Sequence, residues 1–195
     1  MAEVRELLGA CDGWSERTKL YLLLMLNCGA YQSDVADLGD DEVDWKAGTL
    51  TRPRSKVPDG PVVCYKLWPE TFALLKKFRA KAKVPNEHGG NRVLLTDEDK
   101  PLVRYWMEGG KMRHYDVIKA AYSRLLKRVQ VKKPMKQLRK TSATLLGGHE
   151  VYGRYAQYFL AHSPKNVTDR HYVRPNDEQF FGGLNWLRQQ YGLGG

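Results

Sequence analysis

The sequence has few of the features that define membrane proteins or disulfide-stabilised secreted proteins. Its longest apolar run, Leu20 to Leu26, is seven residues long and too short to span a bilayer, so it predicts a buried helix. The N-terminus does not show the charged and then apolar layout of a signal peptide. The cysteines number only three and form no Cys-x-x-Cys pair, which indicates reduced thiols in a cytoplasmic protein.

Metal-binding and repeat patterns are also missing. The five histidines are not paired with the cysteines at zinc-ligand spacing, so we expect no metal and no other cofactor. No internal repeat, low-complexity tract or long linker divides the 195 residues. With 42% hydrophobic residues, the chain is long enough for one core and predicts a single domain covering residues 1–195.

Acidic residues are scarce in most of the chain, and the charge is unevenly placed. The formal net charge is +10, which favours an anionic polymer as the partner. Residues 1–50 carry a net charge of −6, whereas residues 51–195 carry +16. Between Val117 and His149 there are nine basic residues and no acid. Such a run is usually only a solvated face, but beside a phosphate-handling motif it indicates nucleic-acid binding.

The residue pattern predicts a mainly α fold with a small antiparallel β-sheet (α+β). The expected elements are a helix capped by Ser15 and ended by Gly29, a short helix over 33–38, strands over 42–45, 49–52 and 61–65, a helix from Pro69 and a short strand over 93–95. The rest of the chain is expected to be helical, with an apolar stripe from Ile118 to Val129.

Three segments near the C-terminus carry residues suited to phosphate chemistry. They read Lys-Gln-Leu-Arg-Lys-Thr over 136–141, Leu-Ala-His-Ser-Pro over 160–164 and Asp-Arg-His-Tyr over 169–172. A phenol can attack a phosphodiester, but its pKa near 10 leaves it protonated at neutral pH, so it needs nearby cations and a proton acceptor. Guanidinium, imidazolium and ammonium groups also stabilise the negative charge of the phosphoryl transition state.

These segments resemble the active-site end of the tyrosine recombinases of the phage integrase family. The resemblance extends over nearly the whole chain. Residues 26–38 look like the family's first box, and the turn Arg52-Pro53-Arg54-Ser55-Lys56 looks like its sheet turn, which offers a Lys to DNA near the cut. Each box alone is a weak signal, whereas their order and spacing together are a strong one.

The resemblance implies recombination or integration of double-stranded DNA by a metal-free transesterification. Tyr172 would attack the scissile phosphate and form a 3′-phosphotyrosyl link, which a 5′-hydroxyl of the partner strand then reverses. Arg139, His162 and Lys136 would bind the non-bridging oxygens, and Lys56 would protonate the leaving 5′-oxygen. The residues expected to contact DNA elsewhere are Arg52, Arg54, Lys132, Lys133 and Lys140. Relatives usually carry a separate N-terminal DNA-clamping domain, which we expect to be absent, either because this sequence was trimmed or because the protein lacks it. The resemblance also implies an oligomer on DNA, and a DNA-bound protein would be found at the nucleoid.

Two positions depart from the family pattern. Tyr31 stands where the family has its first catalytic Arg, and a phenol supplies neither a positive charge nor a bidentate fork to phosphate. Losing one such donor typically costs about a hundredfold to a thousandfold in rate. Lys136 stands where the family usually has His, a milder change because an ammonium group still donates to phosphate. The resemblance therefore implies an enzyme of reduced activity, with Tyr31 as a degenerate catalytic position.

Each of these residues also has a plain structural interpretation. Tyr172 and Tyr31 would then be packing aromatics, Arg139 a surface helix residue, His162 a helix cap or brace, and Lys56 a solvated loop residue. Two other functions stay open as well. One is a DNA-binding module that kept the fold and lost catalysis, and the other is a generic basic nucleic-acid-binding protein whose match to the family is accidental.

Overall fold

The computed structural model describes residues 1–53, 61–162 and 177–194, and in these ranges the chain folds around one central helix. From Leu20 onward this helix, α2 (Glu16–Asn27), is buried on all sides, because each residue from Leu20 to Leu26 is at most 2% exposed. The Ser15 hydroxyl oxygen caps it by accepting the Thr18 N–H at 3.2 Å, and Gly29, with a φ of +58°, follows its end. Both boundaries confirm the sequence prediction.

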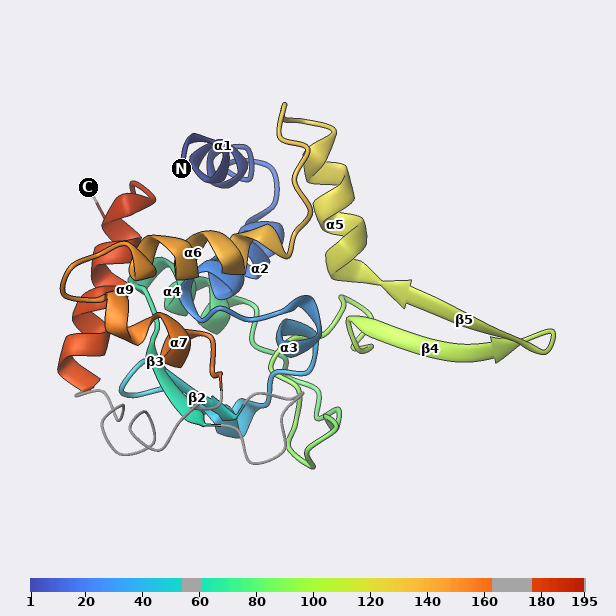
Figure 1. Ribbon diagram of the computed structural model, residues 1–195. Coiled ribbons are helices and arrows are strands. Elements are labelled where there is room, and N and C mark those ends of the chain that lie inside the picture. The colour runs from blue at the N-terminus through green and yellow to red at the C-terminus, as the bar shows by residue number, and fades with distance from the viewer. Residues whose placement is uncertain (54–60, 163–176, 195) are drawn as a thin grey trace.

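The other helices pack around α2 (Figure 1). They are α1 (Ala2–Gly9), α3 (Gln32–Ala36), α4 (Pro69–Lys77), α5 (Val117–Leu126), α6 (Gln137–Gly147), α7 (Ala156–Phe159) and α9 (Asp177–Gln190), with short 3₁₀ turns η1 (Asp40–Glu42) and η2 (Gly153–Tyr155). Of these, α3, α4, α5, α6 and α9 contact α2 directly. Over the described ranges, none of the helices combines the length and the apolar character that a bilayer crossing requires.

A three-stranded antiparallel sheet lies below the helices in Figure 1. Its order is β1 (Val43–Asp44), β2 (Thr49–Pro53) and β3 (Val62–Lys66), and the register pairs Leu50 with Tyr65. Gly48, with a φ of +65°, provides the turn between the first two strands. The predicted sheet, and with it the mainly α fold with a small antiparallel sheet, is confirmed.

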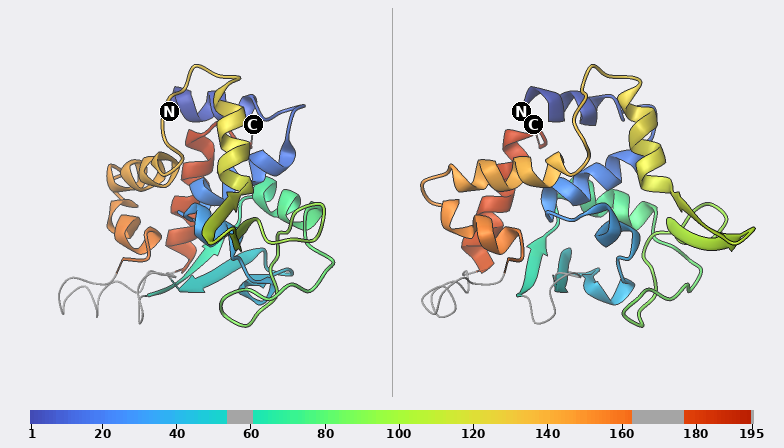
Figure 2. Two further views of the ribbon diagram at one scale, coloured as in Figure 1. Left: turned by 90° about the vertical axis from the view of Figure 1, so that its right-hand side faces the viewer. Right: turned by 45° about the vertical axis from the view of Figure 1, so that its right-hand side comes forward.

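Two sequence predictions are wrong in the segment between α4 and α5. Residues 93–95 are buried but do not form a strand, because their backbone bonds serve neighbouring loops; the Val93 N–H, for example, donates to the Leu38 carbonyl at 2.8 Å. The following residues form a hairpin of β4 (Val103–Glu108) and β5 (Lys111–Asp116) instead of a helix. Gly109 and Gly110 have positive φ values, as a tight hairpin turn requires. The hairpin projects away from the helical body in Figures 1 and 2.

The C-terminal helix α9 is fastened to α4 by a bidentate ion pair. Arg188 donates from Nε to one carboxylate oxygen of Glu70 at 2.9 Å and from Nη2 to the other at 2.7 Å. Both side chains are mostly shielded from solvent, at 18% and 28% exposed. The Arg188 hydrogen bonds hold the pKa of Glu70 below its usual value. The pair therefore stabilises the fold while Glu70 is ionised.

We expect Glu70→Gln to lower the free energy of unfolding at pH 7 by about 1 to 2 kcal/mol, because it removes a charged and bidentate partner of Arg188. The contribution of a carboxylate with a lowered pKa is present above its unfolded pKa, near 4.3, and is lost as the pH falls through the lowered folded value. The difference in unfolding free energy between the parent protein and Glu70→Gln, measured by urea unfolding, should therefore become smaller in acid.

Lys77→Gln is the matched control, because Lys77 pairs with Glu16 at the surface and both side chains are more than half exposed. Its effect should stay below about 0.5 kcal/mol. Equal losses for the two variants, or a Glu70→Gln deficit that does not change with pH, would contradict this account of the pair.

Candidate active site

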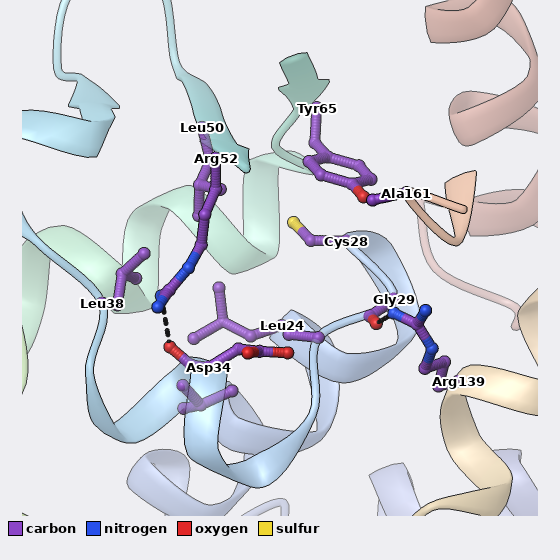
Figure 3. Close-up of a pocket in the computed structure, with 12 residues that line it drawn as sticks. Leu24, Cys28, Gly29, Asp34, Leu38, Leu50, Arg52, Tyr65, Arg139 and Ala161 are labelled. Carbon is purple, nitrogen blue, oxygen red and sulfur yellow. Dashed lines mark hydrogen bonds between the residues drawn. The ribbon is translucent and has the colours of Figure 1, made fainter. Parts of the chain in front are cut away.

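Arg139 is a buried cation near the start of α6. It is 6% exposed, and its Nη1 donates to the Gly29 carbonyl while Nη2 donates to the Leu160 carbonyl at 2.6 Å. Figure 3 shows its guanidinium group turned toward Gly29. Gly29 follows α2 and Leu160 follows α7, so Arg139 joins the C-terminal ends of two helices, where carbonyl groups lack helical partners. The plain interpretation of Arg139 as a surface residue is wrong.

Tyr31 lies against this guanidinium group. The Arg139 Cζ is 4.5 Å from the centroid of the Tyr31 ring, a cation–π geometry. Tyr31 is held at the start of α3, where its N–H donates to the Asp34 carboxylate at 2.7 Å. The structure thus brings together the expected phosphate-binding Arg139 and Tyr31, the residue expected at a degenerate catalytic position. The aromatic ring stabilises the Arg139 cation, whereas a second guanidinium group at position 31 would repel it.

His162 follows a strained residue at the end of α7. Ala161 has a φ of +46° and is 5% exposed, a backbone conformation that costs a residue with a side chain about 1 to 2 kcal/mol. This turn directs His162 away from the helix path. The His162 Nδ1 lies 2.8 Å from the Gln157 Oε1, and because an amide oxygen only accepts, the pair places a proton on Nδ1.

Gln157 is therefore a residue of the site that the sequence interpretation missed. Its spacing of five residues before His162 was the available signal, since the two meet across the end of the one-turn helix α7. The backbone shows the same turn, because the His162 N–H donates to the Gln157 carbonyl at 3.1 Å. The neighbour that sets the histidine tautomer thus comes from the histidine's own segment.

Tyr65 is a tyrosine next to the end of α7, and its buried environment makes its hydroxyl a poor nucleophile. Its hydroxyl donates to the Phe159 carbonyl at 2.9 Å and is buried. Desolvation by burial raises the pKa of Tyr65 well above its usual value, and the nearby Arg139 opposes this only in part. Tyr65 therefore supports the end of α7 from the sheet, as Arg139 does from α6.

The expected lysines lie at the surface. Lys136 immediately precedes α6, three residues before Arg139, and is exposed, as are Lys132, Lys133 and Lys140. The Lys133 ammonium group is 3.5 Å from the Glu3 carboxylate of α1, an exposed pair of small energetic value. Lys136 thus brings a second cation to the end of α6 that carries Arg139.

Arg52 does not lie on the surface, although the sequence predicted a DNA contact for it. It is 7% exposed, and its Nη1 donates to the Asp34 carbonyl at 2.6 Å. The carboxylates of Glu42 and Asp37 lie 3.4 and 3.8 Å from its guanidinium nitrogens. Asp34, Asp37 and Glu42 thus enclose most of the side chain, and the DNA contact expected for Arg52 stays a prediction. Arg52 also borders a small cavity of about 40 Å³, whose opposite side includes Arg139 (Figure 3).

Lys56, Arg54 and Tyr172 lie outside the described residues, so the roles expected for them stay predictions. Among the residues that are described, no group of three or more His, Cys, Asp or Glu side chains is arranged to hold a metal ion. The site consists, over those ranges, of the buried Arg139 with Tyr31, the nearby segment ending at His162, and the exposed Lys136.

A helical body around one buried helix, a three-stranded sheet beneath it and this arginine-centred site define a tyrosine recombinase catalytic fold. Solved structures of similar fold include that of XerA recombinase, with a TM-score of 0.58 and 18% identity. The Tn1549 transposon integrase in complex with circular intermediate DNA gives a TM-score of 0.60 at 16% identity. A lambda integrase dimer bound to a COC' core site gives 0.57 at 16%.

A model of the phage integrase family matches residues 1–179, and the chain belongs to that family. A comparison with curated protein sequences finds no match. The structural alignments cover 98%, 95% and 84% of this chain for the XerA, Tn1549 and lambda proteins, respectively. They cover only 63%, 65% and 56% of those three chains. The sequence thus spans less than two thirds of each of these relatives.

We expect Arg139→Ala to lower the free energy of unfolding by about 2 to 4 kcal/mol, because it leaves the Gly29 and Leu160 carbonyls without their donor. Lys140→Ala is the control, since its exposed side chain is the next residue on the same helix, and it should stay within about 0.5 kcal/mol of the parent. Urea unfolding measures both variants. Equal stability of the two would mean that Arg139 does not join α2 to α7.

Proposed function

We propose that this protein cuts and rejoins duplex DNA through a covalent phosphotyrosyl intermediate, in site-specific recombination or integration. The observation that carries the proposal is the position of Arg139, which is fixed by hydrogen bonds to the Gly29 and Leu160 carbonyls. Leu160 lies only two residues before His162, so the two expected phosphate-binding side chains are close in the structure. Family membership makes DNA the expected substrate. The solved relatives support this, because the Tn1549 and lambda integrases are described in complex with DNA.

In the proposed reaction the Tyr172 hydroxyl attacks the scissile phosphorus, and its proton leaves with solvent or a neighbouring base. A bond forms from the tyrosyl oxygen to phosphorus as the bond to the 5′-oxygen breaks, and Lys56 donates the proton that this oxygen takes up. Arg139 and Lys136 donate to the non-bridging oxygens, where charge develops, and His162 does so from Nε2 in its imidazolium form while Nδ1 donates to Gln157. Attack by a 5′-hydroxyl on the phosphotyrosyl bond reverses the steps, so no external energy source is needed.

The setting of Arg139 supports this assignment. A phosphate-binding group is most effective when it is held in place before the substrate arrives, because no free energy is then spent on orienting it during the reaction. The two carbonyl bonds and the Tyr31 ring restrain the guanidinium group in this way. The exposed lysines Lys132, Lys133 and Lys140 are proposed to contact phosphates farther along the duplex. We further propose that the protein assembles on DNA as a dimer or larger oligomer, at the nucleoid.

The second candidate is a DNA-binding protein of the same fold that no longer cleaves. Tyr31 favours it, because a ring cannot replace the charge of the family's first catalytic Arg. Both candidate functions use the same DNA-binding surface, and they differ only in whether a covalent protein–DNA link forms. They are therefore separated by measuring covalent adducts and not by measuring DNA binding.

The direct experiment incubates the protein with a nicked duplex that traps covalent intermediates and then resolves protein–DNA adducts under denaturing conditions. We expect adducts with the parent protein and none with Tyr172→Phe, which removes the nucleophilic oxygen and keeps the ring. Tyr115→Phe is the control, since Tyr115 lies on the exposed hairpin, and it should still form adducts. Adducts that persist in Tyr172→Phe would show that the nucleophile is misassigned, and DNA binding without any adduct would favour the second candidate.

Tyr31→Arg tests whether the replaced arginine limits the rate. If the rest of the site is intact, a second guanidinium group should raise the rate of adduct formation by about ten- to a thousandfold. Without DNA, the same group would lie beside the Arg139 cation and should lower the melting temperature. Tyr31→Phe is the control, because it keeps the ring over Arg139 and should leave both quantities close to the parent values. An unchanged rate in Tyr31→Arg would mean that another cation already fills this role.

A further inference from the structure

Two buried hydrogen bonds connect the end of α9 with the middle of α6 and the end of α2. The Tyr191 Oη and the Ser142 Oγ are 2.7 Å apart, and the Ser142 Oγ lies 2.8 Å from the Leu26 carbonyl oxygen. Tyr191 is 2% exposed, and Ser142 and Leu26 are fully buried. The hydrogen bonds therefore join three elements inside the core, because Tyr191 follows α9, Ser142 belongs to α6 and Leu26 lies in the last turn of α2.

The direction of both hydrogen bonds follows from the atoms involved. A carbonyl oxygen only accepts, so the single proton of the Ser142 hydroxyl group goes to Leu26. The Tyr191 hydroxyl group must then donate to Ser142. Burial raises the pKa of Tyr191 above its usual value, so this hydroxyl group keeps the proton that it donates. Tyr191 thus orients the Ser142 hydroxyl group toward the end of α2.

Ser142 is a second point at which α6 is attached to the end of α2. The first is Arg139, whose Nη1 donates to the Gly29 carbonyl. The two donors are three residues apart on α6 and so lie on one face of the helix, and their acceptors Leu26 and Gly29 are also three residues apart. Carbonyl groups at a helix end lack helical partners and are available for such bonds. One bond alone would allow α6 to turn against α2, whereas two bonds fix its orientation.

Tyr191 is itself held in place from two sides. Its backbone N–H donates to the Leu187 carbonyl of α9 at 3.2 Å. Its ring packs against the ring of Trp68, with centroids 5.8 Å apart, and the Trp68 Nε1 donates to the Leu184 carbonyl of α9 at 2.8 Å. The hydroxyl group is therefore presented to α6 from a fixed position at the end of α9.

We propose that Tyr191 is a positioning residue for Arg139. Its hydroxyl group keeps Ser142 bonded to Leu26, and this second attachment of α6 keeps the Arg139 guanidinium group aligned with the scissile phosphate. The inference rests on the proposed function, because it treats Arg139 as a phosphate-binding group. A displacement of about 1 Å can cost about a hundredfold in rate, so a small turn of α6 is measurable. Tyr191 thus affects the rate although its buried hydroxyl group contacts neither DNA nor the reacting atoms.

The test compares Tyr191→Phe with Glu70→Gln. The first variant removes one hydroxyl group, whereas the second loosens α9 through its contact with α4 and leaves the contact with α6 intact. On saturating nicked duplex, we expect Tyr191→Phe to lower the single-turnover rate of adduct formation by about three- to tenfold and to leave the DNA affinity within about twofold. Glu70→Gln should leave both quantities within about twofold, since a loss of stability alone does not move Arg139.

Ser142→Ala shows whether Tyr191 acts through Ser142. This variant alone should lower the rate by a similar factor. Adding Tyr191→Phe to it should cause no further loss, because two changes in one chain of hydrogen bonds are not additive. Losses that multiply in the double variant, or equal rates for Tyr191→Phe and Glu70→Gln, would overturn the proposal.

A second measurement does not need the reaction. The side-chain N–H signals of Arg139 in the DNA-free protein, assigned by NMR with the help of Arg139→Lys, report on the hydrogen bonds of the guanidinium group. They should shift in Tyr191→Phe and stay in place in Glu70→Gln. If the parent forms no adducts, such a shift would still support the positioning role, while the proposed cleavage would be removed. Unchanged Arg139 signals in Tyr191→Phe would overturn the positioning role and leave the proposed function intact.

Discussion

The hydrogen bonds from Arg139 to the Gly29 and Leu160 carbonyls are the constraint on which the site depends. They join the end of the central helix α2 to the end of the one-turn helix α7. Because α7 is only four residues long, its own bonds do little to hold its end, and Arg139 and Tyr65 supply the donors its last carbonyls need. His162 comes directly after this fixed end. One buried cation thus organises both the helix packing and the candidate chemistry.

The burial of Arg139 also explains why an aromatic residue is favourable at position 31. A buried guanidinium group is costly unless its environment compensates the charge, and the Tyr31 ring does so at 4.5 Å. Arg52, the other arginine at the small cavity, is compensated differently, by Asp37, Glu42 and the Asp34 carbonyl. The region between α2 and the sheet therefore contains two enclosed cations with separate partners. Replacing Tyr31 by a cation would change this balance in the DNA-free protein.

The sequence predicted those parts of the fold that local patterns determine. The central helix, the sheet and α5 follow from capping residues, turn glycines and apolar periodicity, and all were found close to the expected positions. The hairpin was missed because Tyr105, Met107 and Met112 are apolar yet exposed, so no buried face marked the strands. The burial of Arg52 was not predictable either, because its partners come from α3, from η1 and from the segment between them. In the site, the meeting of Arg139 with Tyr31 required the tertiary structure, since 108 positions separate them.

The most direct test of the central claim is a crystal structure of the Tyr172→Phe protein bound to a duplex with a scissile phosphate. The account predicts Arg139 still bonded to the Gly29 and Leu160 carbonyls, with further guanidinium N–H groups about 3 Å from a non-bridging phosphate oxygen. It also predicts the ring at position 172 beside the phosphorus, and His162 and Lys136 on the same phosphate. A phosphate bound away from Arg139, or an Arg139 side chain that never reaches DNA, would contradict the claim that this residue is both a structural and a phosphate-binding group.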